Sequence, residues 1–199
     1  NLPHVTYKDT REGARSRDPK TYAKDAAILE EALKKEPNNS RYMFYLAQSY
    51  KDAHEYQKSI DCYETRIAMG DWDQEVYWSM LQVAELKKSL GKPSGIIFDD
   101  YFRAYRYRPQ RAEALYGLAD MLNKEHNFAL SYALLKTFPL IPKPQKKDYL
   151  FLQEWMENWG LQFQLSIAAY YLGFYQEALL LNDELLRRDD LTEYFRALI

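Results

Sequence analysis

Apolar side chains recur at helical spacing through the first half of the chain. Residues 40–53 carry them at i, i+3, i+4 and i+7, which is one stripe of a 3.6-residue helix, and residues 56–69 carry a second such stripe. The two stripes consist of Met43, Leu46, Ala47 and Tyr50, and of Tyr56, Ile60, Tyr63 and Ile67. The pattern predicts two consecutive amphipathic helices.

The same pattern returns later in the chain. Residues 45–63 align without a gap on residues 117–135, an offset of 72 residues (117 minus 45), and the alignment pairs Ala47 with Ala119 and His54 with His126. Related segments occupy 75–109 and 165–186. A period of about 34–36 residues, with small residues in both helices and an aromatic after the turn, resembles the tetratricopeptide repeat. The resemblance implies an all-α, right-handed solenoid of about four helix-turn-helix units plus terminal helices.

Turn-forming residues separate the expected helices. Pro37-Asn38-Asn39-Ser40 ends one helix and caps the next, and Asp18-Pro19 is typical of a helix start. Turns inside or after a unit are indicated by Gly91, Pro93, Gly173 and Pro109. Three prolines in residues 139–147 forbid a continuous helix there. We therefore expect a helical domain over 19–199, preceded by a linker or domain edge over 1–18.

An Asp-x-Asp pair, Asp71 and Asp73, raises the question of a metal site. Many sugar-transferring enzymes hold a divalent metal with such a pair, but there it normally follows a buried strand, whereas the preceding residues here have a helical pattern. Either aspartate is well placed to cap a helix beginning near Gln74 and to favour its positive end. We expect capping, with Trp72 packed between units, and no metal site.

Composition narrows the classes of function. The chain of 199 residues has 18 Tyr and only 7 Gly, which favours packed helices. Its 27 Lys plus Arg are balanced by 29 Asp plus Glu, so the whole molecule has no net positive charge that would attract nucleic acid. The single cysteine, Cys62, excludes an internal disulfide and fits a reducing, cytoplasmic location. No apolar run approaches the length of about 18 residues that spans a bilayer.

A second resemblance concerns sugar transfer. Residues 13–79 look like the segment that follows the catalytic domain in family 2 glycosyltransferases with a tetratricopeptide-like C-terminal region, and 107–119 and 165–179 continue the likeness. The matching pieces are Gly13-Ala14-Arg15-Ser16-Arg17-Asp18-Pro19, Arg41-x-x-Phe44-Tyr45-Leu46-Ala47-Gln48-Ser49-Tyr50 and Gly70-x-Trp72-x-x-Glu75.

That resemblance implies a GT-A catalytic domain on the N-terminal side, with a nucleotide-sugar donor and a divalent metal bound there. This sequence has no alternating β-α pattern before residue 19, so we expect that fold to be missing and the chain to be cut from a longer protein. The resemblance places His4, Arg15 and Ser16 near donor phosphates or metal. The competing interpretation is a solvated linker.

Repeat geometry also predicts a candidate binding surface. Counting positions along the first helix of each unit places an aromatic residue at each fifth position, on the concave face, with polar residues nearby. The aromatics are Phe44, Trp78, Tyr116 and Phe163, and the polar residues are Gln48, Gln82, Asp120 and Asn123. Such a row fits sugar rings or an extended peptide. Simple packing between helices is the favoured alternative.

Other clusters of polar residues suggest less. Arg103, Arg106, Arg108 and Arg111 lie among tyrosines, but cations are common at helix ends, and we expect a solvated end. His54 and His126 occupy equivalent turns in different units, which argues against a shared metal.

Two functions remain open. The favoured one is a non-catalytic repeat region of a family 2 glycosyltransferase, contacting a glycan or protein acceptor, its own catalytic domain or another copy. The alternative is an independent adaptor for a peptide or protein partner. Neither needs a cofactor or catalytic residue in this chain.

Overall fold

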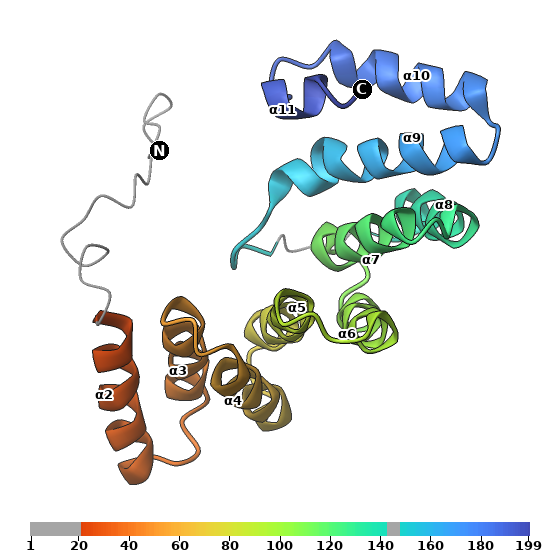
Figure 1. The fold of residues 1–199 in the computed structure, drawn as a ribbon. Helices are drawn as coiled ribbons and strands as arrows, with labels where there is room; N and C mark the ends of the chain where they lie inside the picture. The colour runs from red at the N-terminus through yellow and green to blue at the C-terminus, as the bar shows by residue number, and fades with distance from the viewer. Residues whose placement is uncertain (1–20, 143–147) are drawn as a thin grey trace. The chain divides into compact units, whose positions relative to one another are not determined.

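The computed structural model describes residues 21–142 and 148–199, which form two compact units (Figure 1). The first unit ends at Gly70 and the second begins at Asp71. The expected helix start at Asp18-Pro19, the donor-side residues His4, Arg15 and Ser16, and most of the proline-rich segment lie outside the described residues.

The first unit is a helix followed by a helical hairpin. Its helices are α2 (Thr21–Lys35), α3 (Ser40–Asp52) and α4 (Tyr56–Met69). Asn39 caps α3 by accepting a hydrogen bond from the Tyr42 N–H at 3.0 Å, as the Pro37-to-Ser40 turn predicted. Buried Ser59 donates to the Ala47 carbonyl at 2.7 Å, so the small repeat positions allow α3 and α4 to approach closely. The two predicted amphipathic helices are confirmed.

The second unit contains three further helical hairpins. Its helices are α5 (Asp73–Ser89), α6 (Ser94–Tyr107), α7 (Ala112–Lys124), α8 (Phe128–Thr137), α9 (Leu161–Tyr171), α10 (Tyr175–Leu186) and the short α11 (Glu193–Arg196). A 3-10 turn, η1 (Phe138–Leu140), follows α8, and a π-helical turn, η2 (Met156–Gly160), leads directly into α9. From α5 to α10, helices adjacent in sequence pack side by side (Figure 1).

The turns inside the four hairpins share one geometry. The residues at the equivalent position, His54, Gly91, His126 and Gly173, have φ of 61°, 63°, 60° and 83°. In each turn this residue's N–H bonds three residues back and the next N–H bonds five residues back, which is the Schellman motif that closes a helix. The predicted equivalence of His54 and His126 is therefore confirmed, and both adopt the left-handed conformation that glycine supplies elsewhere.

The expected aspartate cap before α5 is wrong. Trp72 is the N-cap residue and makes no capping hydrogen bond with its side chain, while Asp73 is already the first helical residue. Asp71 lies one position too early and has a φ of 67°. The Asp73 carboxylate forms an ion pair with Arg108. Its place in the first turn still matches the positive end of the helix.

Candidate functional site

Every aromatic of the predicted row packs against another aromatic side chain of the chain. In the first unit, Phe44 is buried with its ring centroid 6.2 Å from that of Tyr63. In the second unit, each predicted aromatic contacts an aromatic from outside the hairpins. The pairs are Trp78 with Phe151 at 4.9 Å, Tyr116 with Trp155 at 5.1 Å, and Phe163 with Phe195 at 5.1 Å between ring centroids. All four positions take part in internal packing, and their role in binding a partner stays a prediction.

One of the covering segments, residues 148–153, is called the strap. Its backbone is held by side chains from the N-terminal ends of α5 and α7. Gln74 accepts hydrogen bonds from the N–H groups of Tyr149 and Leu150 at 3.1 and 3.0 Å, and Glu113 accepts one from the Gln153 N–H at 3.0 Å. Arg111 donates to the Leu150 carbonyl at 3.3 Å. This end of the helices therefore binds a peptide backbone, and the peptide is the chain's own.

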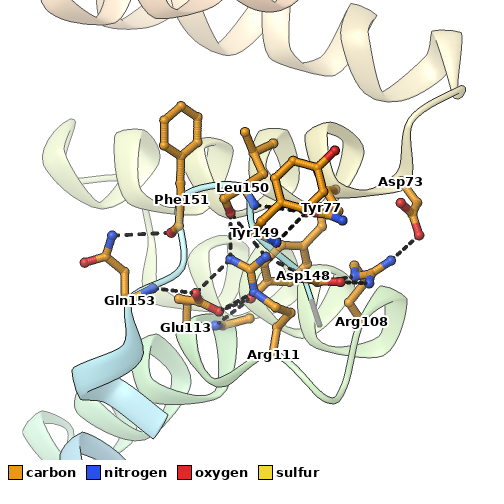
Figure 2. Close-up of polar contacts among 12 residues, drawn as sticks. Asp73, Tyr77, Arg108, Arg111, Glu113, Asp148, Tyr149, Leu150, Phe151 and Gln153 are labelled. Atoms are coloured by element: carbon orange, nitrogen blue, oxygen red, sulfur yellow. Dashed lines mark hydrogen bonds and ion pairs between the residues drawn. The ribbon is translucent and has the colours of Figure 1, made fainter. Parts of the chain in front are cut away.

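A buried ion cluster fixes the strap (Figure 2). Arg111 makes two hydrogen bonds to Glu113, at 2.9 and 2.7 Å, and a third to Asp148 at 3.3 Å. All three residues are more than nine-tenths buried, and the Arg111 guanidinium also lies over the ring of Tyr77 at 4.8 Å. Arg108 binds Asp148 from the other side, with 3.0 Å between Nε and Oδ2. Charges so deeply buried are tolerated because each has a partner.

The cluster shifts the pKa values of its members. Burial alone would raise the pKa of Glu113, but hydrogen bonds and attraction from Arg111 outweigh it and hold this pKa below the ordinary carboxyl value. Burial raises the pKa of Tyr77 well above its usual range, and the nearby Glu113 charge adds to the effect. The expectation of a solvated arginine end is therefore wrong for Arg108 and Arg111, whereas Arg103 and Arg106 are exposed.

Part of the helical face that carries the predicted aromatic row stays open. A cavity of about 860 Å³ lies between the C-terminal turns of α7, the α9 helix and the segment around α11, and four predicted site residues line it: Tyr116, Asp120, Asn123 and Phe163. Of the other predicted polar residues, Gln82 is buried elsewhere, and Gln48 lines a separate cavity of about 420 Å³ in the first unit. Four of the eight residues predicted for the concave face thus line one cavity, and their role in binding stays a prediction.

The cavity combines aromatic walls with unsatisfied amide groups. Phe128 and Tyr171 stack with centroids 4.3 Å apart, and Tyr170 and Tyr194 are largely exposed. Asn123 uses its amide N–H groups to bond Gln164, while its own carbonyl oxygen is buried without a partner. The Asn182 side-chain oxygen is in the same state. Two acceptors without donors at one cavity are costly unless a donor reaches them.

The Asp120 carboxylate on the cavity wall is paired within the chain. Asp120 forms ion pairs with two lysines, its Oδ2 lying 3.1 Å from the Nζ of Lys88 and 2.8 Å from the Nζ of Lys124. Among the residues that the structure describes, no group of three or more His, Cys, Asp or Glu side chains is placed to hold a metal ion.

Sequence reasoning missed the strap and the far wall of the cavity. The signal was present as aromatics outside the repeat pattern: Phe151 and Trp155 before α9, and Tyr194 and Phe195 after α10. In the segment after α10, Phe195 and Leu191 pack onto Trp159, Phe163 and Leu185. This segment therefore caps the last hairpin.

Comparison with known proteins identifies the fold. No family model and no curated protein matches the chain. Among solved structures, YrrB, described as a TPR protein with an unusual peptide-binding site, matches with a TM-score of 0.58 and 12% identity over 85% of this chain and 79% of its own. MamA matches with a TM-score of 0.61 and 13% identity, covering 86% and 87% of the two chains.

A third match is a putative kinesin light chain with nearly identical TPR-like repeats from Podospora anserina. Its TM-score is 0.57 and its identity 14%, over 82% of this chain and 85% of its own. The three structural likenesses confirm that the chain has the tetratricopeptide-like helical-repeat fold.

Within the described part of this chain, no helix has the length and apolar character needed to cross a membrane.

Proposed function

We propose that this chain is a protein-interaction domain that binds a peptide segment of a partner protein in the cavity beside α7 and α9. The observation that carries the proposal is the open cavity with exposed aromatic walls, lined also by Asn123 and Asn182, whose side-chain oxygens are buried without a partner. A peptide suits such a cavity, because its apolar side chains cover the rings and its backbone N–H groups are donors. A neighbour of the same fold, YrrB, is described as having a peptide-binding site.

The chemistry of the cavity indicates the kind of peptide. Asp120 is already paired with two lysines, so a basic segment gains little there. The stacked rings of Phe128 and Tyr171 and the exposed ring of Tyr170 favour an aliphatic or aromatic side chain. The expected ligand is an extended peptide with one or two apolar side chains between solvated ends.

The test is selection of a random peptide library on the full chain, followed by affinity measurement of the selected peptides. Changing Tyr170 to Ala is expected to weaken binding at least tenfold, because this ring is 55% exposed in the cavity wall and its loss removes contact area without opening the core. Tyr107→Ala, at an exposed position on α6, is the matched control and should bind normally. Equal loss in both variants, or no selected peptide, would contradict the proposal.

A second candidate keeps the link to sugar transfer. We propose as the alternative that the domain is the cytoplasmic, non-catalytic region of a family 2 glycosyltransferase, where the cavity receives a glycan acceptor and other surfaces contact the catalytic domain or another copy. The sequence likeness over residues 13–79 supports it, and aromatic faces beside amides suit sugar rings as well as peptides. A glycan array probed with the same two variants separates the candidates, since glycan binding lost only in Tyr170→Ala would favour this one.

A further inference from the structure

The outer side of α10 is apolar and uncovered. Tyr175 and Leu179 are each 63% exposed and Leu186 is 43% exposed. Their spacing of four and seven residues places them on one side of the helix. The chain that follows α10 turns back instead of covering this side, because Leu191 and Phe195 pack against Trp159 and Leu185 (Figure 1).

The preceding hairpin shows what such a helix side does in this fold. When Gly173 is placed on the equivalent His126, the α10 residues Tyr175, Leu179 and Asp183 fall on the α8 residues Phe128, Tyr132 and Lys136. Those three α8 residues are contacts to the next hairpin. Phe128 stacks on Tyr171, Tyr132 donates to Glu177 at 2.7 Å and packs on Phe174 at 5.2 Å, and Lys136 pairs with Glu177 at 3.0 Å.

The α10 face, defined as Tyr175, Leu179, Asp183 and Leu186, continues that internal interface with two changes. An aromatic residue again occupies the first position, but the apolar Leu179 stands where Tyr132 donates a hydrogen bond, and the anion Asp183 stands where α8 has the cation Lys136. We propose that the α10 face is a docking site for a helical hairpin of a partner protein. The partner places an aromatic residue on Tyr175 and apolar surface on Leu179, and presents a Lys or Arg to Asp183 where the internal hairpin presents Glu177.

The probe follows from the internal interface. It is a fluorescent peptide with the sequence of residues 161–186, the hairpin that covers α8, carrying Glu177→Lys to match Asp183 and Leu179→Gln to prevent stacking of the peptide on itself. A second peptide keeps Glu177. Each is titrated against the full chain by fluorescence anisotropy. Folding of the peptide can be coupled to binding, so a peptide that is disordered alone remains a valid probe.

We expect saturable binding, about three- to tenfold tighter for the peptide with Glu177→Lys, because an attractive exposed pair replaces a repulsive one. Asp183→Lys in the full chain should reverse this preference. Leu179→Asp in the full chain should weaken binding at least tenfold by charging the centre of the face. Leu140→Asp, at another largely exposed apolar position, is the control and should leave binding unchanged.

Three results would overturn the proposal. The first is no saturable binding at about 1 mM peptide. The second is a preference between the two peptides that Asp183→Lys does not reverse, which would indicate exchange with the internal hairpin. The third is concentration-dependent dimerisation of the full chain, measured by sedimentation and abolished by Leu179→Asp, which would make the α10 face a contact between copies. Tyr170 packs against Tyr175 of this face, with 5.5 Å between ring centroids, so the cavity variant used here is Tyr194→Ala, at a cavity-lining position that is 69% exposed. Tyr194→Ala should bind the hairpin peptide normally and the cavity peptide weakly, so this test and the cavity test fail independently.

Discussion

The N-terminal turns of α5 and α7 and the C-terminal turns of α7 and α9 carry similar side chains but are in opposite states. At the first region, Trp78 and Tyr116 are covered by Phe151 and Trp155. At the second, Tyr170 is exposed and the Asn123 oxygen has no partner. The difference lies in the segment between α8 and α9, because the strap and Trp155, which follows it, pack on the first region. An aromatic row therefore does not by itself mark a binding site.

The covered region is also the better satisfied one. Arg111, Glu113 and Asp148 are all deeply buried, and each makes hydrogen bonds to another member of the cluster. In the open region, two amide oxygens lack donors. We infer that stability is concentrated where the strap binds and that capacity for a ligand is concentrated in the cavity. Four changes test this comparison, from the largest expected effect to the smallest.

Arg111→Met should have the largest effect. It leaves Glu113 buried without its cation, so the free energy of unfolding should fall by about 3–5 kcal/mol in urea titration. The matched variant Arg111→Met with Glu113→Leu removes both charges and should recover much of that loss. A loss below about 1 kcal/mol for the single change would show that the cluster does not fix the covered region.

Trp155→Ala should lower the free energy of unfolding by about 2–3 kcal/mol, since the half-buried ring packs on Tyr116, Trp159 and Phe195. Tyr149→Ala is the control from the strap itself. Its ring is 73% exposed, so its effect should stay within about 0.5 kcal/mol. If thermal or urea unfolding showed that Trp155→Ala and Tyr149→Ala lower the free energy of unfolding by similar amounts, the burial of the first ring and the exposure of the second would be contradicted.

Acid should weaken the covered region first. The pKa of Glu113 is lower in the folded chain than in the unfolded chain, so its contribution is complete above the unfolded carboxyl pKa of about 4.3 and is lost as pH falls through the folded pKa. The free energy of unfolding should therefore decline below about pH 4. Glu113→Gln should flatten this decline. Glu177→Gln, which removes a more exposed carboxylate of lowered pKa, should flatten it less.

Asn182→Leu should have the smallest effect, of opposite sign. It removes a buried oxygen without a partner and replaces it with an apolar side chain of similar size, so stability should rise by about 0.5–1 kcal/mol. Peptide affinity at the cavity should fall in the same variant. If thermal unfolding showed a loss of stability instead, the Asn182 oxygen would already have a hydrogen-bond donor in solution, and the cavity would offer no unpartnered acceptor there.

The helices and turns could be predicted because their causes are local. The stripe from Met43 to Tyr50, the Asn39 cap and the left-handed positions at His54 and Gly173 depend on residues within one or two turns. The aspartate cap failed although it too is a local feature. It failed because the helix begins one residue earlier than expected, which makes Trp72 the N-cap and Asp73 the first helical residue. The Asp73 carboxylate instead pairs with Arg108, which is distant in sequence.

The amino-acid sequence alone determined the repeat period and the hairpins, since helix periodicity and turn chemistry operate over a few residues. Only the tertiary structure decided which part of the aromatic face is closed. That outcome depends on contacts such as Gln74 with Tyr149, which join residues 75 positions apart. Where an irregular segment such as the strap settles is set by the partners that it finds across the fold, and no repeat pattern encodes its path.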